Sequence, residues 1–155
     1  MRGDYRSMKN VQQYGLIIAL VVAAVVLVQA DRSREPEFVR NVRSMLGDAY
    51  SEENCSRFVC LAHGLNDYPC TAMDIWNGCG GRLKVVQQVR AEKLAYLDVP
   101  AGAVVAFHGA HVAVSLGNHT FADSTPERGV STFRWEDVRK DDLWYSGPVR
   151  IMVWK

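Results

Sequence analysis

NCSRFV, residues 54–59, places a cysteine where a helix is expected to begin. HVAVSLGN, residues 111–118, places a histidine at the head of an alternating strand. A cysteine nucleophile needs a base, and that base is often a histidine from a distant part of the chain. The two stretches therefore predict a domain that holds Cys55 against His111.

The residues around Cys55 predict a helix over 55–63. Phe58 and Val59 begin its apolar stripe, Asn54 is a suitable N-cap, and Gly64 is suited to end the helix. The partial positive charge at a helix start favours a thiolate at Cys55. The alternative is an inert buried cysteine, which is common in protein cores. The position at the helix start and the downstream histidine favour the nucleophile.

Four histidines compete for the role of base. His63 lies further along the cysteine's own helix and should point away from Cys55. His119 falls at a hairpin turn and is expected to be solvated, and His108 precedes a glycine in a predicted loop. His111, which heads an alternating strand, is the preferred base.

Hydrophobic periodicity predicts the other elements. Beyond 55–63, the predicted helices span residues 37–46, 72–76 and 133–140, and the predicted strands span 103–107, 111–116, 119–123 and 149–154. Residues 97–102 read as a turn and 124–129 as a loop, whereas 83–97 fit no single pattern. Helices followed by a meander of strands predict an α+β domain with its helices on one face of an antiparallel sheet.

The four cysteines form no C-x-x-C pair, which gives a zinc site little support. If Cys55 stays free for chemistry, at most one disulfide forms among the other three. Cys70 with Cys79 is one option, and Cys60 with either of them is another.

Residues 14–30 carry no charge and are mostly aliphatic, which predicts an N-terminal membrane anchor or, alternatively, a signal peptide over residues 1–30. Residues 31–36 would then be a linker. The basic flank before the apolar run should stay in the cytoplasm, so both readings place the domain outside, anchored or secreted. Residues 1–30 hold 3 of the 18 basic and 1 of the 17 acidic residues, so 15 basic and 16 acidic remain, a net charge of −1. That balance disfavours a nucleic-acid partner.

These motifs, in this order, resemble the NlpC/P60 group of papain-like cysteine peptidases, which are related to the CHAP amidases. The family pattern has Asp-Cys-Ser-Gly-Phe-Val at the nucleophile, a Pro-Gly-Asp turn into an apolar strand, and His-Val-Gly-Ile-Tyr-Leu-Gly-Asn at the base. The corresponding residues here are 54–59, 100–105 and 111–118. Tyr68-Pro69-Cys70-Thr71 is similar to the family's Leu-Pro-Arg-Thr. The resemblance covers roughly residues 37–123 and implies a hydrolase domain over 37–155.

The chain departs from that pattern at several positions. Asn54 stands for Asp, Arg57 for Gly and Ala103 for the Asp of the turn. The Gly-rich segment before the nucleophile is shortened to residues 51–54.

The resemblance also implies roles for individual residues. Asp123 corresponds to the polar residue that orients the histidine, the alternative being a turn-forming Asp. Tyr50 is similar to the tyrosine near the oxyanion, or is a packing aromatic. The helix start at Cys55 and Ser56 would hold the oxyanion. From the irregular loop that follows, Tyr68 and Trp76 would line a groove, whereas the other tryptophans, Trp135, Trp144 and Trp154, fit core or sheet positions.

The implied activity is cleavage of an amide in the stem peptides of peptidoglycan, with no metal or organic cofactor. Small anchored hydrolases of this kind occur in bacteria and in phages, where they act in lysis or entry. Two alternatives stay open: a non-catalytic module that binds wall peptides or partners, and a thiol acyltransferase acting at the membrane. Intact Cys55, His111 and Asp123 argue against the first.

Overall fold

A computed structural model of the chain describes residues 35–51, 54–66, 70–138 and 143–155. The chain divides into two units, Met1–Pro36 and Glu37–Lys155, and every helix and strand named below belongs to the second. The predicted anchor or signal segment at residues 1–30 lies outside the described residues, as does most of the predicted linker. Within the described ranges, no helix has both the length and the apolar character that crossing a bilayer requires.

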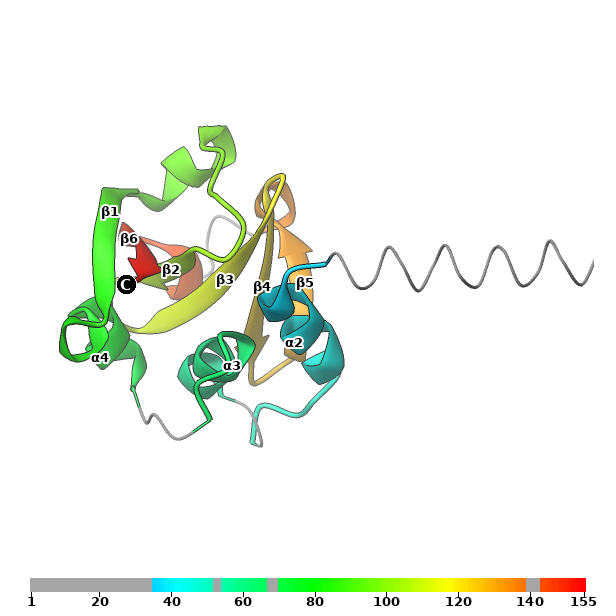
Figure 1. The fold of residues 1–155 in the computed structure, drawn as a ribbon. Coiled ribbons are helices and arrows are strands. Elements are labelled where there is room, and N and C mark those ends of the chain that lie inside the picture. Colours follow the sequence, from blue (N-terminus) through cyan, green and yellow to red (C-terminus); the bar gives the residue numbers. More distant parts are fainter. Residues whose placement is uncertain (1–34, 52–53, 67–69, 139–142) are drawn as a thin grey trace, which may run out of the picture. The chain divides into compact units, whose positions relative to one another are not determined.

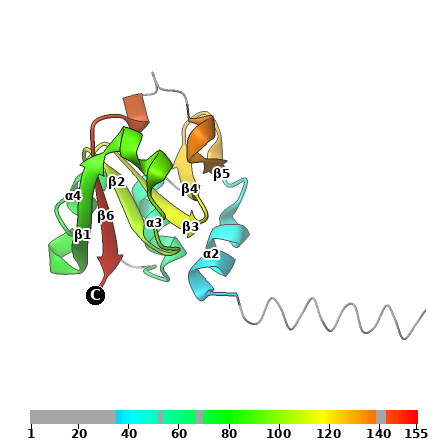
Figure 2. The ribbon, with the colours of Figure 1, turned by 90° about the horizontal axis from the view of Figure 1, so that it is seen from above.

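The second unit is built on a six-stranded antiparallel sheet, which confirms the predicted α+β class. Its strands run in the order β1-β6-β2-β3-β4-β5, so β6 lies between β1 and β2 (Figure 2). The bounds are β1 Leu83–Arg90, β2 Val104–Phe107, β3 His111–Gly117, β4 Thr120–Thr125, β5 Gly129–Arg134 and β6 Pro148–Trp154. Four of these match predicted strands to within about two residues, and β1 occupies the first half of the stretch that fitted no pattern.

The prediction of a helix at 133–140 is wrong. Phe133 and Arg134 end strand β5, and a short 3-10 turn follows at Trp135–Asp137. Phe133 pairs with Phe121 across the β4–β5 ladder, with ring centroids 5.7 Å apart. This cross-strand contact stabilises the strand over the helix that local spacing suggested. The predicted loop at 124–129 is also shorter than expected, because β4 extends to Thr125 and β5 begins at Gly129.

Three α-helices precede the sheet where the sequence predicts them. They are α2 Glu37–Met45, α3 Cys55–Ala62 and α4 Ala72–Trp76. Gly47 and Gly64, the predicted stops, adopt positive φ values of 92° and 73°, a conformation that glycine takes without steric cost. Helix α3 packs beside α2 and against strands β3 and β4 (Figure 1). The cysteine helix therefore lies against the strand that begins with His111, as predicted.

Both faces of the sheet are buried at strands β2 and β3, whereas β1 is mostly exposed. On the helical side, Phe58 and Val59 of α3 pack with Val112 and Val114 of β3. On the other side, 3-10 segments at Ala91–Tyr96, Trp135–Asp137 and Leu143–Tyr145 cover a second cluster. Strand β2 is accordingly buried along its whole length, as expected for a strand enclosed between two layers.

The cysteines resolve into one disulfide and two free thiols. Cys70 and Cys79 are bonded, which was one of the predicted pairings, and Cys55 and Cys60 are free and buried. Burial raises the pKa of Cys60, and a hydrogen bond with the backbone of Cys70 offsets only part of this effect. Because nucleophilicity requires the thiolate, Cys60 is the less reactive type of buried cysteine.

Candidate active site

Cys55 is the first residue of helix α3 and is 6% exposed. Asn54 caps the helix, and its side-chain oxygen accepts the N–H of Arg57 at 3.1 Å and the hydroxyl of Ser56 at 2.9 Å. The N–H groups of Cys55 and Ser56 lie in the first turn, where an α-helix has no carbonyls of its own to bond them. The thiol therefore lies at a helix end that favours negative charge.

His111 is the first residue of β3 and is 1% exposed. Its Nε2 lies 2.8 Å from Oδ2 of Asp123, and the imidazole is close enough to Cys55 to interact with it electrostatically. Burial by itself would lower the pKa of His111, but the hydrogen bond with Asp123, the interaction with Cys55 and the charges of both groups raise it to about 9. The imidazole therefore carries a second proton at neutral pH.

Asp123 lies in strand β4 with its side chain fully buried. It lies across the β3–β4 hairpin from His111. The ladder pairs Val114 with Ala122, so continuing the register brings Asp123 beside Ala113, diagonal to His111 on the same face. Diagonal neighbours across a sheet remain within reach of long side chains, and the 2.8 Å contact is made.

Tyr145 and Arg128 belong to the site, and sequence reasoning missed both. The hydroxyl of Tyr145 donates to Oδ2 of Asp123 and accepts a hydrogen bond from Nη2 of Arg128 at 2.6 Å. The same guanidinium nitrogen lies 3.5 Å from Oδ1 of Asp123. Tyr145 comes from a 3-10 turn after β5, in a stretch whose sequence has no periodicity, so only the fold brings it here.

Trp144, predicted as a core or sheet aromatic, lies in the same 3-10 turn as Tyr145 and is half-buried. Its ring meets the imidazole of His111 edge-on, with centroids 5.5 Å apart. It therefore forms part of the wall of the site and lies outside any strand.

Tyr50 lies close enough to Cys55 to sense its charge. The pKa of Tyr50 is raised, first by burial and then by the charges of Cys55 and Glu127. Its loop is fixed to the sheet, because Gly47 donates its N–H to the carbonyl of Val130, and Val130 donates to that of Asp48, both at 2.9 Å. The structure therefore brings Tyr50 to the same end of α3 as the thiol.

Two aromatic residues were predicted to line a groove. One of them, Tyr68, lies outside the described residues. Trp76 lies at the end of α4 under the guanidinium of Arg150, 4.2 Å from the ring centroid. Because its own carbonyl also accepts a hydrogen bond from Arg150 at 2.7 Å, Trp76 is built into the scaffold on that side.

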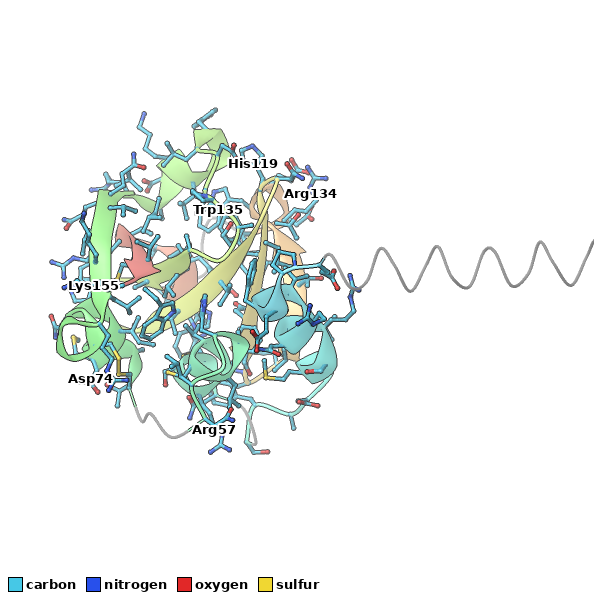
Figure 3. The ribbon with its side chains drawn as sticks, in the orientation of Figure 1. Arg57, Asp74, His119, Arg134, Trp135 and Lys155 are labelled. Carbon is cyan, nitrogen blue, oxygen red and sulfur yellow. A yellow bond between two sulfur atoms is a disulfide. The ribbon has the colours of Figure 1, made fainter. Side chains whose placement is uncertain are left out.

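The remaining histidines are not brought to Cys55. His63 caps the far end of α3, where burial lowers its pKa to about 4. His108 is exposed and lies beside Trp76, with ring centroids 6.2 Å apart. His119 is half-buried where a solvated side chain was predicted, and its carbonyl accepts a hydrogen bond from the N–H of Trp135 at 3.1 Å. Figure 3 places His119 at the opposite end of the domain from Arg57, which lies exposed on the first turn of α3.

Within the described part of the chain, no group of three or more His, Cys, Asp or Glu side chains is arranged to hold a metal ion. Comparisons of the chain with protein-family models, with curated proteins and with solved structures gave no significant match. A thiol at a helix start, beside an imidazole that a buried carboxylate orients, can generate a thiolate–imidazolium pair.

Proposed function

We propose that this chain is a cysteine amidase of the papain-like type, similar to the NlpC/P60 group, and that it cleaves an amide bond in peptidoglycan stem peptides. The observation that carries the proposal is that Cys55, buried at the start of α3, interacts with His111, whose imidazole is bonded to the buried carboxylate of Asp123. The geometry supports thiol chemistry, and the family resemblance supplies the substrate class.

The proposed reaction begins with the thiolate of Cys55 attacking the carbonyl carbon, which forms a C–S bond and leaves an oxyanion. The first-turn N–H groups of Cys55 and Ser56 are the nearest donors for that oxyanion, with the hydroxyl of Tyr50 as a further one. Since Nε2 of His111 bonds Asp123, Nδ1 is the nitrogen left to face the thiol. That nitrogen gives its proton to the leaving amine as the C–N bond breaks.

The second half of the reaction hydrolyses the thioester. His111, now neutral, takes a proton from a water molecule as the water oxygen attacks the acyl carbon. The C–S bond then breaks, which releases the carboxylic acid and restores the thiolate beside the imidazolium. Asp123 holds the imidazole in one tautomer throughout.

Two features outside the site fit an extracytoplasmic wall substrate. The disulfide between Cys70 and Cys79 is typical of proteins that mature outside the reducing cytoplasm. The apolar stretch at residues 14–30 predicts export with membrane attachment or secretion. Together they support a proposed activity on the periplasmic or outer side of the membrane.

The test is release of peptide fragments from purified peptidoglycan by the full chain in detergent, followed by mass spectrometry. Cys55→Ala and His111→Ala should each lower release by about 100-fold or more. Cys60→Ala is the matched control, since it removes the other free thiol from the same helix. The reductant is kept low enough that thiol counting still shows the Cys70–Cys79 bond.

The fragment masses would identify the bond that is cut. Release that survives Cys55→Ala would overturn the proposal. So would the absence of release by the intact chain across several wall types. In that second case, an acyl group found on Cys55 after incubation with lipid would favour the acyltransferase alternative.

A further inference from the structure

The buried carboxylate of Asp123 has a second set of partners besides His111. We propose that Tyr145 and Arg128 are positioning residues of the active site, which hold the carboxylate of Asp123 in the orientation that His111 needs and share its negative charge. The inference rests on the proposed thiol chemistry at Cys55 but not on the identity of the substrate. It extends the Cys55–His111–Asp123 series to a residue that reaches the surface.

Oδ2 of Asp123 accepts two hydrogen bonds. One comes from Nε2 of His111 at 2.8 Å and the other from the hydroxyl of Tyr145. A carboxylate oxygen has two lone pairs, so these two donors together fix the rotation of the group. Without the phenol, the carboxylate would be free to turn about its own bond while still contacting the imidazole.

Tyr145 is itself held rigidly. It is 6% exposed, and its ring meets His111 and Phe107 edge-on, with centroids 5.3 Å and 5.4 Å away. It also packs against Phe133 at 5.2 Å. A phenol confined on these sides delivers its hydroxyl to one place, which is what orienting a partner requires.

Arg128 brings a positive charge to this buried group from the surface. Its side chain is 42% exposed, yet Nη2 reaches both the hydroxyl of Tyr145 and Oδ1 of Asp123. The O–H donor and the guanidinium both draw charge from the carboxylate. If they were removed, Asp123 would attract the proton on His111 more strongly, and His111 would give it up less readily to a leaving amine.

The competing interpretation is that Tyr145 only fills space in the aromatic cluster around Phe107. Tyr145→Phe separates the two readings, because it keeps the ring and removes only the hydroxyl. Arg128→Met removes the guanidinium from a partly exposed position and should leave the fold intact. Tyr96→Phe and Arg134→Met are matched controls: Tyr96 is 83% exposed, and Arg134 pairs with Glu136 at the surface.

Two measurements on the full chain need no substrate. One is the NMR titration of the His111 imidazole, and the other is the rate of alkylation of Cys55 by iodoacetamide against pH, located by mass spectrometry. In Tyr145→Phe, we expect the midpoint of the His111 titration, and with it the alkaline step of the alkylation profile, to move up by roughly one pH unit. Arg128→Met should move both in the same direction by less, and the two controls should move neither.

On peptidoglycan, Tyr145→Phe should lower kcat about ten-fold and change KM by less than about two-fold, since it alters proton transfer and leaves substrate contacts in place. An unchanged His111 midpoint in folded Tyr145→Phe and Arg128→Met would overturn the inference. If the midpoint moves while the wild type releases no wall fragments, the positioning role stands and the proposed function fails.

Discussion

At the scale of the residue, the imidazole of His111 carries a second proton, and so a positive charge, at neutral pH. Burial of the ring favours the neutral form, but Asp123 bonds it and Cys55 lies beside it, and together they raise its pKa to about 9. In the proposed reaction, the acid that protonates the leaving amine is therefore already charged before the substrate binds.

The raised pKa of His111 predicts that the domain loses stability in alkali. A histidine whose pKa in the folded state exceeds its unfolded value of 6.5 contributes stability that is fully present below pH 6.5 and is lost as pH rises through about 9. The shift corresponds to about 3 kcal/mol of unfolding free energy. Urea denaturation of the wild type at pH 6 and pH 10 should show this decline.

His111→Gln is the control for that experiment, since it removes the titrating group while other groups titrate alike in both proteins. The variant should show a smaller decline between the two pH values. Equal declines in wild type and variant would mean that His111 is not the source of the alkaline loss.

The residues of the site differ in how far a sequence could identify them. Cys55 and His111 stand in stretches with their own local patterns, a capped helix start and an alternating strand. Asp123 was identified only through the family resemblance, as the residue that corresponds to the polar partner of the histidine. Tyr145 and Arg128 carry no such local signal, and Tyr145 reaches Asp123 only through the packing of the turn after β5.

At the scale of the element, the loop that carries Tyr50 depends on one glycine of the sheet. Gly129 begins β5 with a φ of +63°, and a Cβ added there would overlap the carbonyl oxygen of Asp48. The same loop makes two backbone hydrogen bonds with Val130. The close approach of the two backbones is possible only because position 129 has no side chain.

Gly129→Ala should therefore displace the loop and lower activity as well as stability. We expect a loss of more than about 2 kcal/mol in unfolding free energy, from backbone strain together with the clash, and slower alkylation of Cys55. Gly64→Ala is the matched control: its φ of +73° brings similar strain, but its Cβ would meet nothing within 4 Å. The interpretation would be contradicted if both variants lost the same stability and neither changed the reactivity of Cys55.

Elements with a strong local pattern were predictable and those that depend on partners were not. Helix α3 and strand β3 follow from apolar spacing and from glycines that end them. Residues 133–140 have a helical spacing, but Phe133 pairs with Phe121 of the neighbouring strand, and Phe133 and Arg134 belong to β5. Strand β1 carries few buried residues of its own and is fixed by pairing with β6.

At the scale of the whole molecule, the disulfide ties the segment that contains α4 into one loop. Cys70 and Cys79 are 9 residues apart in the chain, and closing a loop of that size in the unfolded state is worth about 3 kcal/mol. The double variant Cys70→Ala/Cys79→Ala should lose roughly that much unfolding free energy in urea denaturation. Reductant should destabilise the wild type to the same extent and leave the stability of the double variant unchanged. If the two proteins were equally stable without reductant, the disulfide would not contribute this free energy.

The position of β6 has a consequence for the order of events during synthesis. Residues 148–154 form the strand between β1 and β2, so until they are translated β1 has no strand partner and β2 has only β3. A nascent chain can thus pair β2 to β5 before β1 is fixed, and this non-local pairing of β1 is slow. If the chain is exported as proposed, the sheet would stay incomplete until β6 joins β1 to the rest.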